Sequence, residues 1–223
     1  LISRIHVRQR QGYGLGDSSP ASVNVPPDIT RRPQMRLVVH VGIEKTATTT
    51  LQEWLYANRG KLLSQGVLLP LSLSHPNNKT LVHCFQEDID DFFLENGFAD
   101  DMARKAFCDE VLRNFRIEIM QFPKCSSVII TSEHFHSRLT NPNEIEAFID
   151  WARGIFDDIL ILGYLRSQAQ LCVSKYSTAV RGRRVESIDE YLITNTEMRE
   201  YYNMYEFAQK WWAATGGACV FRS

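Results

Sequence analysis

One stretch of this chain, LVVHVGIEKTATTTLQEWL at residues 37–55, limits the possible folds more than any other. It opens with a continuous apolar run, which is typical of a buried parallel strand, and Gly42 ends that run. After a short loop, apolar residues recur at helical spacing from Leu51, so we expect a helix to begin near Thr48. The stretch therefore predicts a buried strand, a loop and a helix in direct succession.

The loop in this stretch has the composition of an anion-binding site. Free N–H groups at a helix N-terminus carry a partial positive charge, and a phosphate binds well there. The same loop adds an ammonium group and several hydroxyls, from Lys45, Thr46, Thr48, Thr49 and Thr50. Helix capping is the alternative role for these hydroxyls. The loop is not a standard P-loop, because Glu44 stands where that pattern has a glycine before the lysine.

The segment HVGIEKTATTTLQ resembles the loop that binds the 5′-phosphosulfate in sulfotransferases dependent on 3′-phosphoadenosine 5′-phosphosulfate (PAPS), especially in their bacterial-type branch. The matching residues are His40, Gly42, Lys45, Thr46, Thr48, Thr49, Leu51 and Gln52. Ala47 replaces the usual glycine and Thr50 the usual serine. Alanine adopts a positive φ only at a cost, so we expect an unstrained loop only if φ of residue 47 is negative. The resemblance implies a PAPS-binding loop made of Gly42, Lys45, Thr46, Ala47, Thr48, Thr49 and Thr50.

A second candidate segment begins where a predicted strand at 159–165 ends. Arg166 follows that strand directly, and Ser174 lies eight residues later, about two turns into the next helix. The planar guanidinium of an arginine suits an anion, whereas a mid-helix serine is usually exposed or bonded to its own turn. The surrounding residues, YLRSQAQLCVSKYS, are similar to the family segment in which an arginine and a serine hold the 3′-phosphate of PAPS. The resemblance implies that role for Arg166 and Ser174.

The rest of the chain alternates strands with helices, which predicts an α/β fold of three layers, α/β/α, with a central parallel sheet. The further expected strands are at 66–70, 127–130, 159–165 and 218–221, and the further expected helices are at 101–120, 141–156, 169–180, from Ser187, and at 199–214. Residues 71–98 are irregular, and we expect either a pocket wall or lid, or a solvated connection with a short helix. The resemblance implies a P-loop NTPase-like sulfotransferase fold that is truncated at its C-terminus.

Length and composition predict one domain at 35–223, preceded by a disordered or weakly ordered segment at 1–34 that is rich in Gly, Pro and Arg. The formal net charge of −1 gives no reason to expect nucleic-acid binding. The five cysteines are dispersed, which favours reduced thiols over a disulfide framework or a metal site. No apolar run reaches membrane-spanning length and no signal peptide is visible, so we expect a cytoplasmic chain without a membrane span.

The resemblance implies transfer of a sulfuryl group from PAPS, without a metal, to a hydroxyl or amine of a carbohydrate or small molecule. Lys45 would neutralise the leaving phosphate, and a general base would take the acceptor proton. Glu133 is our candidate, because it follows the strand at which carbohydrate sulfotransferases carry a catalytic glutamate. His134 and His136 compete with it, since histidine has the better intrinsic pKa. If the strand continues, only one of the adjacent pair Glu133 and His134 faces the site.

Two other functions stay open. The first is a non-catalytic protein that binds PAPS or its product 3′-phosphoadenosine 5′-phosphate (PAP), or an inactive sulfotransferase fragment. The second is a nucleotide kinase or NTPase, which requires a Gly-Lys-Ser/Thr loop and a magnesium-binding Asp at a strand end. Neither feature is present, because Glu44 precedes Lys45 and the two strands run into Glu133 and Arg166. The acceptor and the oligomeric state do not follow from the sequence.

Overall fold

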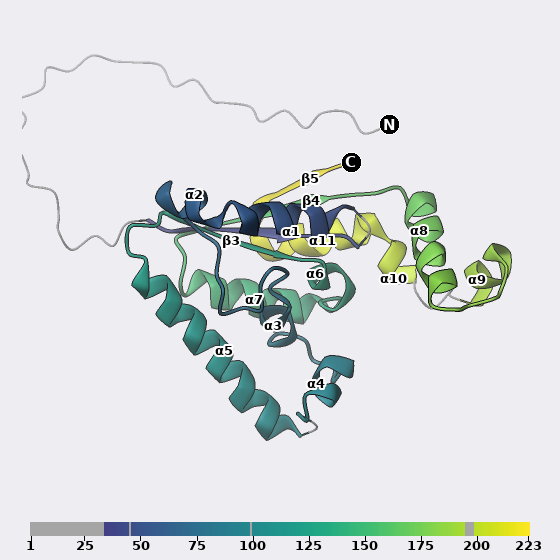
Figure 1. The fold of residues 1–223 in the computed structure, drawn as a ribbon, viewed down its shortest axis with the longest axis horizontal. Helices are drawn as coiled ribbons and strands as arrows, with labels where there is room; N and C mark the ends of the chain where they lie inside the picture. The colour runs from purple at the N-terminus through teal and green to yellow at the C-terminus, as the bar shows by residue number, and fades with distance from the viewer. Residues whose placement is uncertain (1–33, 45, 99, 195–198) are drawn as a thin grey trace, which may run out of the picture. The chain divides into compact units, whose positions relative to one another are not determined.

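Within the described part of the chain, five strands form one sheet in which all neighbours run parallel, as the sequence predicts (Figure 1). The structure is a computed structural model that describes residues 34–44, 46–98, 100–194 and 199–223. The strand order is β2-β3-β1-β4-β5. The strands are β1 (Arg36–Val41), β2 (Val67–Leu68), β3 (Ser127–Ser132), β4 (Asp158–Tyr164) and β5 (Cys219–Arg222). Helices on both faces complete the predicted α/β/α layers (Figure 1).

The predicted central strand, β1, lies between β3 and β4, which explains its continuous apolar run. Leu37, Val39 and Val41 are fully buried and face the main core. The register places Val41 opposite Ser132 at the end of β3. The backbone N–H of Gly42 then donates to the Ser132 carbonyl at 3.0 Å. As a result, the loop after β1 and the residues after β3 begin side by side at the carboxyl edge of the sheet.

The main core is formed where α7 and α11 pack against each other and against β4 and β5. Several of its aromatic side chains meet edge to face, for example Phe135 and Trp211 with ring centroids 5.6 Å apart. The helices are α1 (Thr48–Ala57), α2 (Arg59–Ser64), α3 (Lys79–His83), α4 (Asp91–Glu95), α5 (Asp101–Gln121), α6 (His134–Ser137), α7 (Pro142–Arg153), α8 (Gln168–Arg181), α9 (Ile188–Thr194), α10 (Arg199–Tyr202) and α11 (Met204–Thr215). Such aromatic pairs stabilise the fold beyond the burial of their area.

Two predicted helices differ from the observed ones. The helix expected at 141–156 is α7, and it ends at Arg153 because Gly154 is its C-cap, although Phe156 is still buried in the core. The helix expected at 199–214 is divided into α10 and α11 at Asn203. The Asn203 side chain accepts a hydrogen bond from the Glu206 N–H at 3.2 Å and so starts a new helix. A capping residue inside an apolar pattern is easily overlooked, because the apolar period continues across it.

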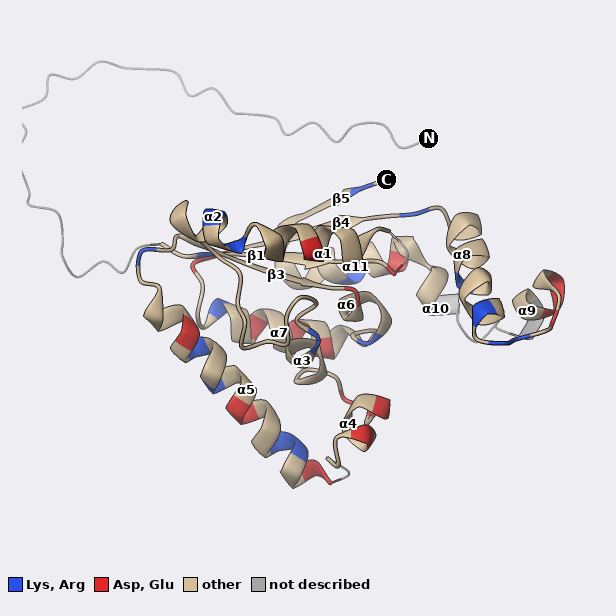
Figure 2. Cartoon of the chain, viewed as in Figure 1, with Lys and Arg blue, Asp and Glu red and all other residues tan. Residues whose placement is uncertain are grey.

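The segment at 71–98 is a packed part of the domain and not a solvated connection. It contains α3 and α4, and its Leu73, Leu81, Val82 and Phe93 are fully buried. α3 contacts the long helix α5. Along α5, Lys and Arg residues are interspersed with Asp and Glu residues (Figure 2). The segment therefore forms a wall of the domain beneath the carboxyl edge of the sheet.

Helix α8 is less embedded than its apolar spacing predicts. Leu171 is its one buried residue, while Val173 and Val180 are 56% and 46% exposed. In the described ranges, α8 makes its main helix contacts with α9 and α10. All five cysteines are free thiols. Among the described helices, none is both long enough and apolar enough to cross a membrane. The prediction for 1–34 falls outside the described residues, apart from Gln34, and stays a prediction.

We predict that Asn141→Ala destabilises the domain by about 1 kcal/mol and lowers its Tm by about 2–4 °C. Asn141 caps α7, accepting a hydrogen bond from the Asn143 N–H at 3.0 Å and completing a capping box with Glu144. Thermal unfolding measures the effect. Asn143→Ala, an exposed change in the same turn, is the matched control and leaves Tm almost unchanged. Equal effects of the two substitutions would contradict the capping role.

Candidate functional site

The loop between β1 and α1 ends in a residue with left-handed backbone geometry. Ala47, the N-cap of α1, has φ 61° and ψ 25°. The condition for an unstrained loop, a negative φ, is therefore not met. At the start of the loop, a Cβ on Gly42 would lie only 2.7 Å from Thr48 Cγ2. Gly42 is thus needed for close approach of the backbone to Thr48, and Ala47 occupies a conformation that favours glycine.

The threonine hydroxyls shape the loop and do not cap the helix. Thr46 Oγ1 and Thr48 Oγ1 donate to the Ile43 carbonyl at 2.7 and 3.2 Å. The N-cap residue, Ala47, has no side-chain hydrogen bond to the first turn of α1. The capping alternative is therefore wrong for these hydroxyls. The first N–H groups of α1 have no partner within the helix, which leaves them for a ligand or solvent.

A pocket of about 390 Å³ lies at this helix N-terminus. Its lining combines three segments that are far apart in the sequence: Glu44, Ala47, Thr48 and Thr49 from the loop after β1, Glu133 and His134 after β3, and Ser174 from α8. Parallel strands end at the same edge of a sheet, and ligands of open α/β folds bind there. The structure thus brings together residues that the sequence analysis took from three separate segments.

Glu133 and His134 both line this pocket, so the condition under which only one of them would face it, a continuing strand, is not met. The reason is that β3 ends at Ser132 and Glu133 adopts helical backbone geometry, with φ −72° and ψ −19°. Adjacent residues alternate between faces only in a strand. His136, the other competing base, is buried elsewhere and its Nε2 donates to the Tyr201 carbonyl at 3.0 Å. The candidate bases are therefore Glu133 and His134.

Glu133 is held by a buried amide on α1. Gln52 Nε2 donates to Glu133 Oε2 at 2.8 Å, and Gln52 is only 2% exposed. This hydrogen bond fixes the orientation of the Glu133 carboxylate. Burial lowers the pKa of His134, although the nearby Glu133 charge opposes that shift. The imidazole is consequently neutral at pH 7, which is the form that a general base requires.

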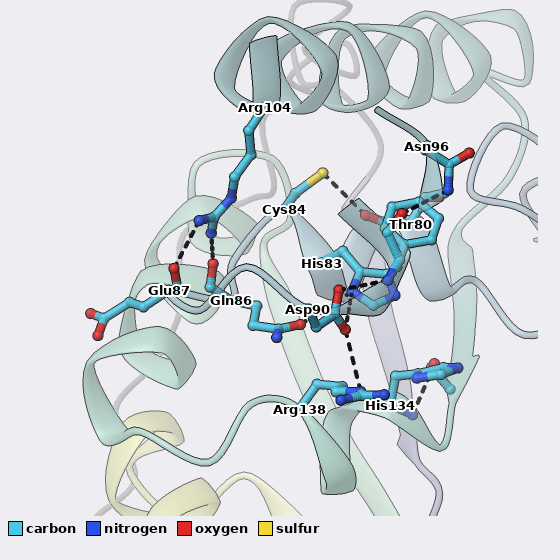
Figure 3. Close-up of polar contacts among 12 residues, drawn as sticks. Thr80, His83, Cys84, Gln86, Glu87, Asp90, Asn96, Arg104, His134 and Arg138 are labelled. Carbon is cyan, nitrogen blue, oxygen red and sulfur yellow. Dashed lines mark hydrogen bonds and ion pairs between the residues drawn. The ribbon is translucent and has the colours of Figure 1, made fainter. Parts of the chain in front are cut away.

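The wall behind His134 is a buried polar network from the 71–98 segment (Figure 3). Asp90 lies between His83 and Arg138, and its Oδ2 is 3.4 Å from both His83 Nδ1 and Arg138 Nε. The imidazoles of His83 and His134 are 5.5 Å apart. Burial lowers the pKa of His83 to about 4, which keeps its ring neutral beside His134. Arg104 of α5 closes the network by donating to the Gln86 and Glu87 carbonyls.

Glu44 also lines the pocket, and its charge is compensated by two partners that the sequence did not indicate. Lys175 Nζ lies 2.9 Å from Glu44 Oε2, and the Tyr201 hydroxyl donates to the same oxygen at 2.8 Å. Burial alone would raise the pKa of Glu44, but the hydrogen bonds and charge of these partners outweigh it and hold the pKa below its usual value. Glu44 is therefore an ionised carboxylate at the edge of the pocket, paired with an ammonium.

Arg166 and Ser174 lie together in a neighbouring pocket of about 460 Å³. Ser174 lines both pockets, so the two adjoin at this residue. Thr50 instead lines an apolar depression on the other side of α1, next to Trp54 and Tyr164. Gly42 lines none of these three pockets and acts through the shape of the loop. Lys45 lies outside the described residues, and its role stays a prediction.

The sequence analysis missed four contributors to this site: Gln52, Glu44, Lys175 and Tyr201. Gln52 matches the resembled loop, and its position on the inner side of α1 was the available signal for a contact with a neighbouring strand end. No comparable signal existed for the other three. Glu44 is separated from Lys175 by 131 positions and from Tyr201 by 157 positions, so only the fold brings them together.

We predict that Ala47→Gly raises the free energy of unfolding by about 1 kcal/mol, because it removes the cost of left-handed geometry in alanine. Ala147→Gly is the matched control, since Ala147 is exposed in the middle of the right-handed helix α7. It should lower the free energy of unfolding by about 1 kcal/mol. Urea denaturation measures both, and a loss of stability in both variants would exclude a positive φ at residue 47.

Comparison with known proteins adds a distant structural likeness. No family model matches the chain, and no curated protein matches it. The structure is similar to a crystal structure of a sulfotransferase from Alicyclobacillus acidocaldarius, with a TM-score of 0.44 and 18% identity over 83% of this chain and 71% of that one. A likeness this distant carries no argument about the fold, the substrate or the mechanism of this chain.

Proposed function

We propose that this chain is a sulfotransferase that moves a sulfuryl group from PAPS to a hydroxyl or amine of a carbohydrate or small molecule. One observation carries the proposal: Ala47, Thr48, Thr49, Glu133, His134 and Ser174 line a single pocket at the N-terminus of α1. These residues came from separate segments of the sequence, and two of those segments resemble the parts of the family that hold opposite ends of PAPS.

The pocket suits the anionic end of such a ligand. The N–H groups at the start of α1 and the Thr49 hydroxyl would bind the 5′-phosphate, and the proposal assigns Lys45 to the leaving oxygen. Arg166 and Ser174 would hold the 3′-phosphate in the adjoining pocket. Glu44, the one carboxylate of the loop, is paired with Lys175, which compensates its charge toward a bound phosphate. PAPS would supply the activated sulfuryl group.

The acceptor proton would go to Glu133. Its carboxylate is oriented by Gln52 and lies in the same pocket as the α1 N-terminus. As the acceptor oxygen or nitrogen bonds to sulfur, the bond from sulfur to the 5′-phosphate oxygen breaks and the acceptor proton passes to the carboxylate. His134 would line the part of the pocket that receives the acceptor.

Free thiols at all five cysteines favour a reducing compartment such as the cytoplasm.

A protein that binds PAP without turnover is the second candidate. The left-handed geometry of Ala47, where the resembled loop has glycine, favours it, because strain at this residue raises the cost of holding the loop in the arrangement that a transition state needs. The two candidate functions share the nucleotide site and differ in whether Glu133 takes the proton of an acceptor during sulfuryl transfer. Binding and turnover must therefore be measured separately.

Binding of PAP is the first test of the proposed function. We expect PAP to bind in calorimetry with micromolar-range affinity and more tightly than ATP. Arg166→Ala should weaken PAP binding by about 10-fold or more, because it removes charge-assisted hydrogen bonds. Arg181→Ala is the matched control, since this exposed arginine lies at the far end of α8 and bonds to Ser177 of its own helix. Equal affinity for PAP and ATP would contradict a site for the 3′-phosphate.

The rate of sulfuryl transfer is the second test of the proposed function. Glu133→Gln keeps the shape of the side chain and should preserve PAP affinity, while the rate of sulfuryl transfer falls about 10²–10⁴-fold. Transfer from radiolabelled PAPS to a panel of hydroxyl and amine acceptors measures the rate. Full activity of Glu133→Gln with loss of activity in His134→Asn would assign the base to His134. PAP binding by the wild type without transfer to any acceptor would support the second candidate function.

A further inference from the structure

Glu44 presents an electrostatic problem for a pocket that is proposed to bind phosphate. Its carboxylate and that of Glu133 both line the pocket, so an anion there would meet two negative charges. His134, the other titratable group in the lining, is neutral at pH 7 because burial lowers its pKa. Among the described residues, no lysine or arginine lines this pocket directly. Besides Lys45, which lies outside the described residues, a cation that pairs with Glu44 from behind the pocket wall can offset these two charges.

Lys175 is in the right place to be that cation. It follows Ser174, a residue of the pocket lining, and its Nζ lies 2.9 Å from Glu44 Oε2. The same ammonium lies over the Tyr201 ring, 4.4 Å from its centroid. The side chains of Lys175 and Glu44 are only 24% and 23% exposed, so solvent screens the pair less than it would a surface pair. Lys175 is thereby held in one position between α10 and the loop.

We propose that Lys175 is the counter-ion that makes this pocket an anion site, and that Glu44 restrains its affinity. In the free protein Lys175 cancels the charge of Glu44, and when an anion binds, the ammonium attracts both groups. This inference rests on the proposed function for the identity of the natural ligand, but it requires only that the pocket binds a phosphate. It assigns a binding role to Lys175, which is not among the residues that match the two resembled family segments.

The alternative is that the pair acts only as a structural clamp. α8 has a single buried residue, Leu171, so a link from Lys175 to the loop could simply hold this helix in place. A clamp is broken equally by removing either partner. A counter-ion is not, because removing Lys175 leaves an unpaired carboxylate in the pocket, whereas removing the charge of Glu44 leaves an unpaired ammonium there. The two roles therefore predict different signs for Glu44→Gln.

The test uses calorimetry of the full chain with adenosine 5′-monophosphate (AMP), which carries a 5′-phosphate and no 3′-phosphate. We expect Lys175→Met to weaken AMP binding by about 10-fold or more. Glu44→Gln should bind AMP at least as tightly as the wild type. The double variant should recover to within about 3-fold of the wild type, because it contains neither charge. Tyr201→Phe controls for loss of the hydroxyl on Glu44 and should change AMP affinity little.

Three outcomes would overturn the inference. Equal weakening by Lys175→Met and Glu44→Gln would identify a clamp, unchanged affinity in Lys175→Met would remove the counter-ion, and a wild type that binds no AMP would exclude an anion site. Circular dichroism and thermal unfolding of each variant separate these results from a failure to fold. Failure of the proposed function looks different: the wild type would bind AMP and PAP equally, while the opposite effects of the two charge substitutions would remain.

Discussion

The candidate site depends on the parallel register of β1 and β3. This register places Val41 opposite Ser132, and the Gly42 N–H continues the ladder by one more hydrogen bond to the Ser132 carbonyl. The loop that leads to α1 and the turn that carries Glu133 therefore leave the sheet at the same position along the strand direction. A change of register by one residue would reverse which side chains face the core, so the buried residues of β1 also fix the position of the site.

Ala47 shows how a site of this kind is maintained against local preference. The αL conformation is unfavourable for alanine by about 1–2 kcal/mol. It persists because both sides of the loop are fixed: Gly42 allows Thr48 to approach, and the Thr46 and Thr48 hydroxyls converge on the Ile43 carbonyl. With the loop closed in this way, residue 47 has little freedom to adopt a negative φ. The geometry that turns the first N–H groups of α1 toward the pocket is thus over-determined by its neighbours.

The sequence was sufficient to predict the α/β architecture and the loop after β1, but not the residues that contact Glu44 and Glu133. Continuous apolar runs and helical periods predict the parallel sheet, since both are local patterns. The same method placed Glu133 just past the strand but left open which of Glu133 and His134 faces the site, because the direction of a side chain after a strand end is not a local pattern. For 71–98 it left a pocket wall and a solvated connection open, since the buried leucines of that segment follow no period. Contacts such as Gln52 with Glu133 depend on how α1 crosses the sheet, which no local pattern contains.

The two carboxylates of the pocket differ in the donors that hold them, and this difference separates their roles. Glu44 receives an ammonium and a phenol at one oxygen, which keep it ionised and lower its pKa, so it is a weak base. Glu133 receives a neutral amide from Gln52. The two carboxylates are thus held by different donors, from α1, α8 and α10, that approach the pocket from different sides. This difference suits the proposed division of roles, with charge balance at Glu44 and proton transfer at Glu133.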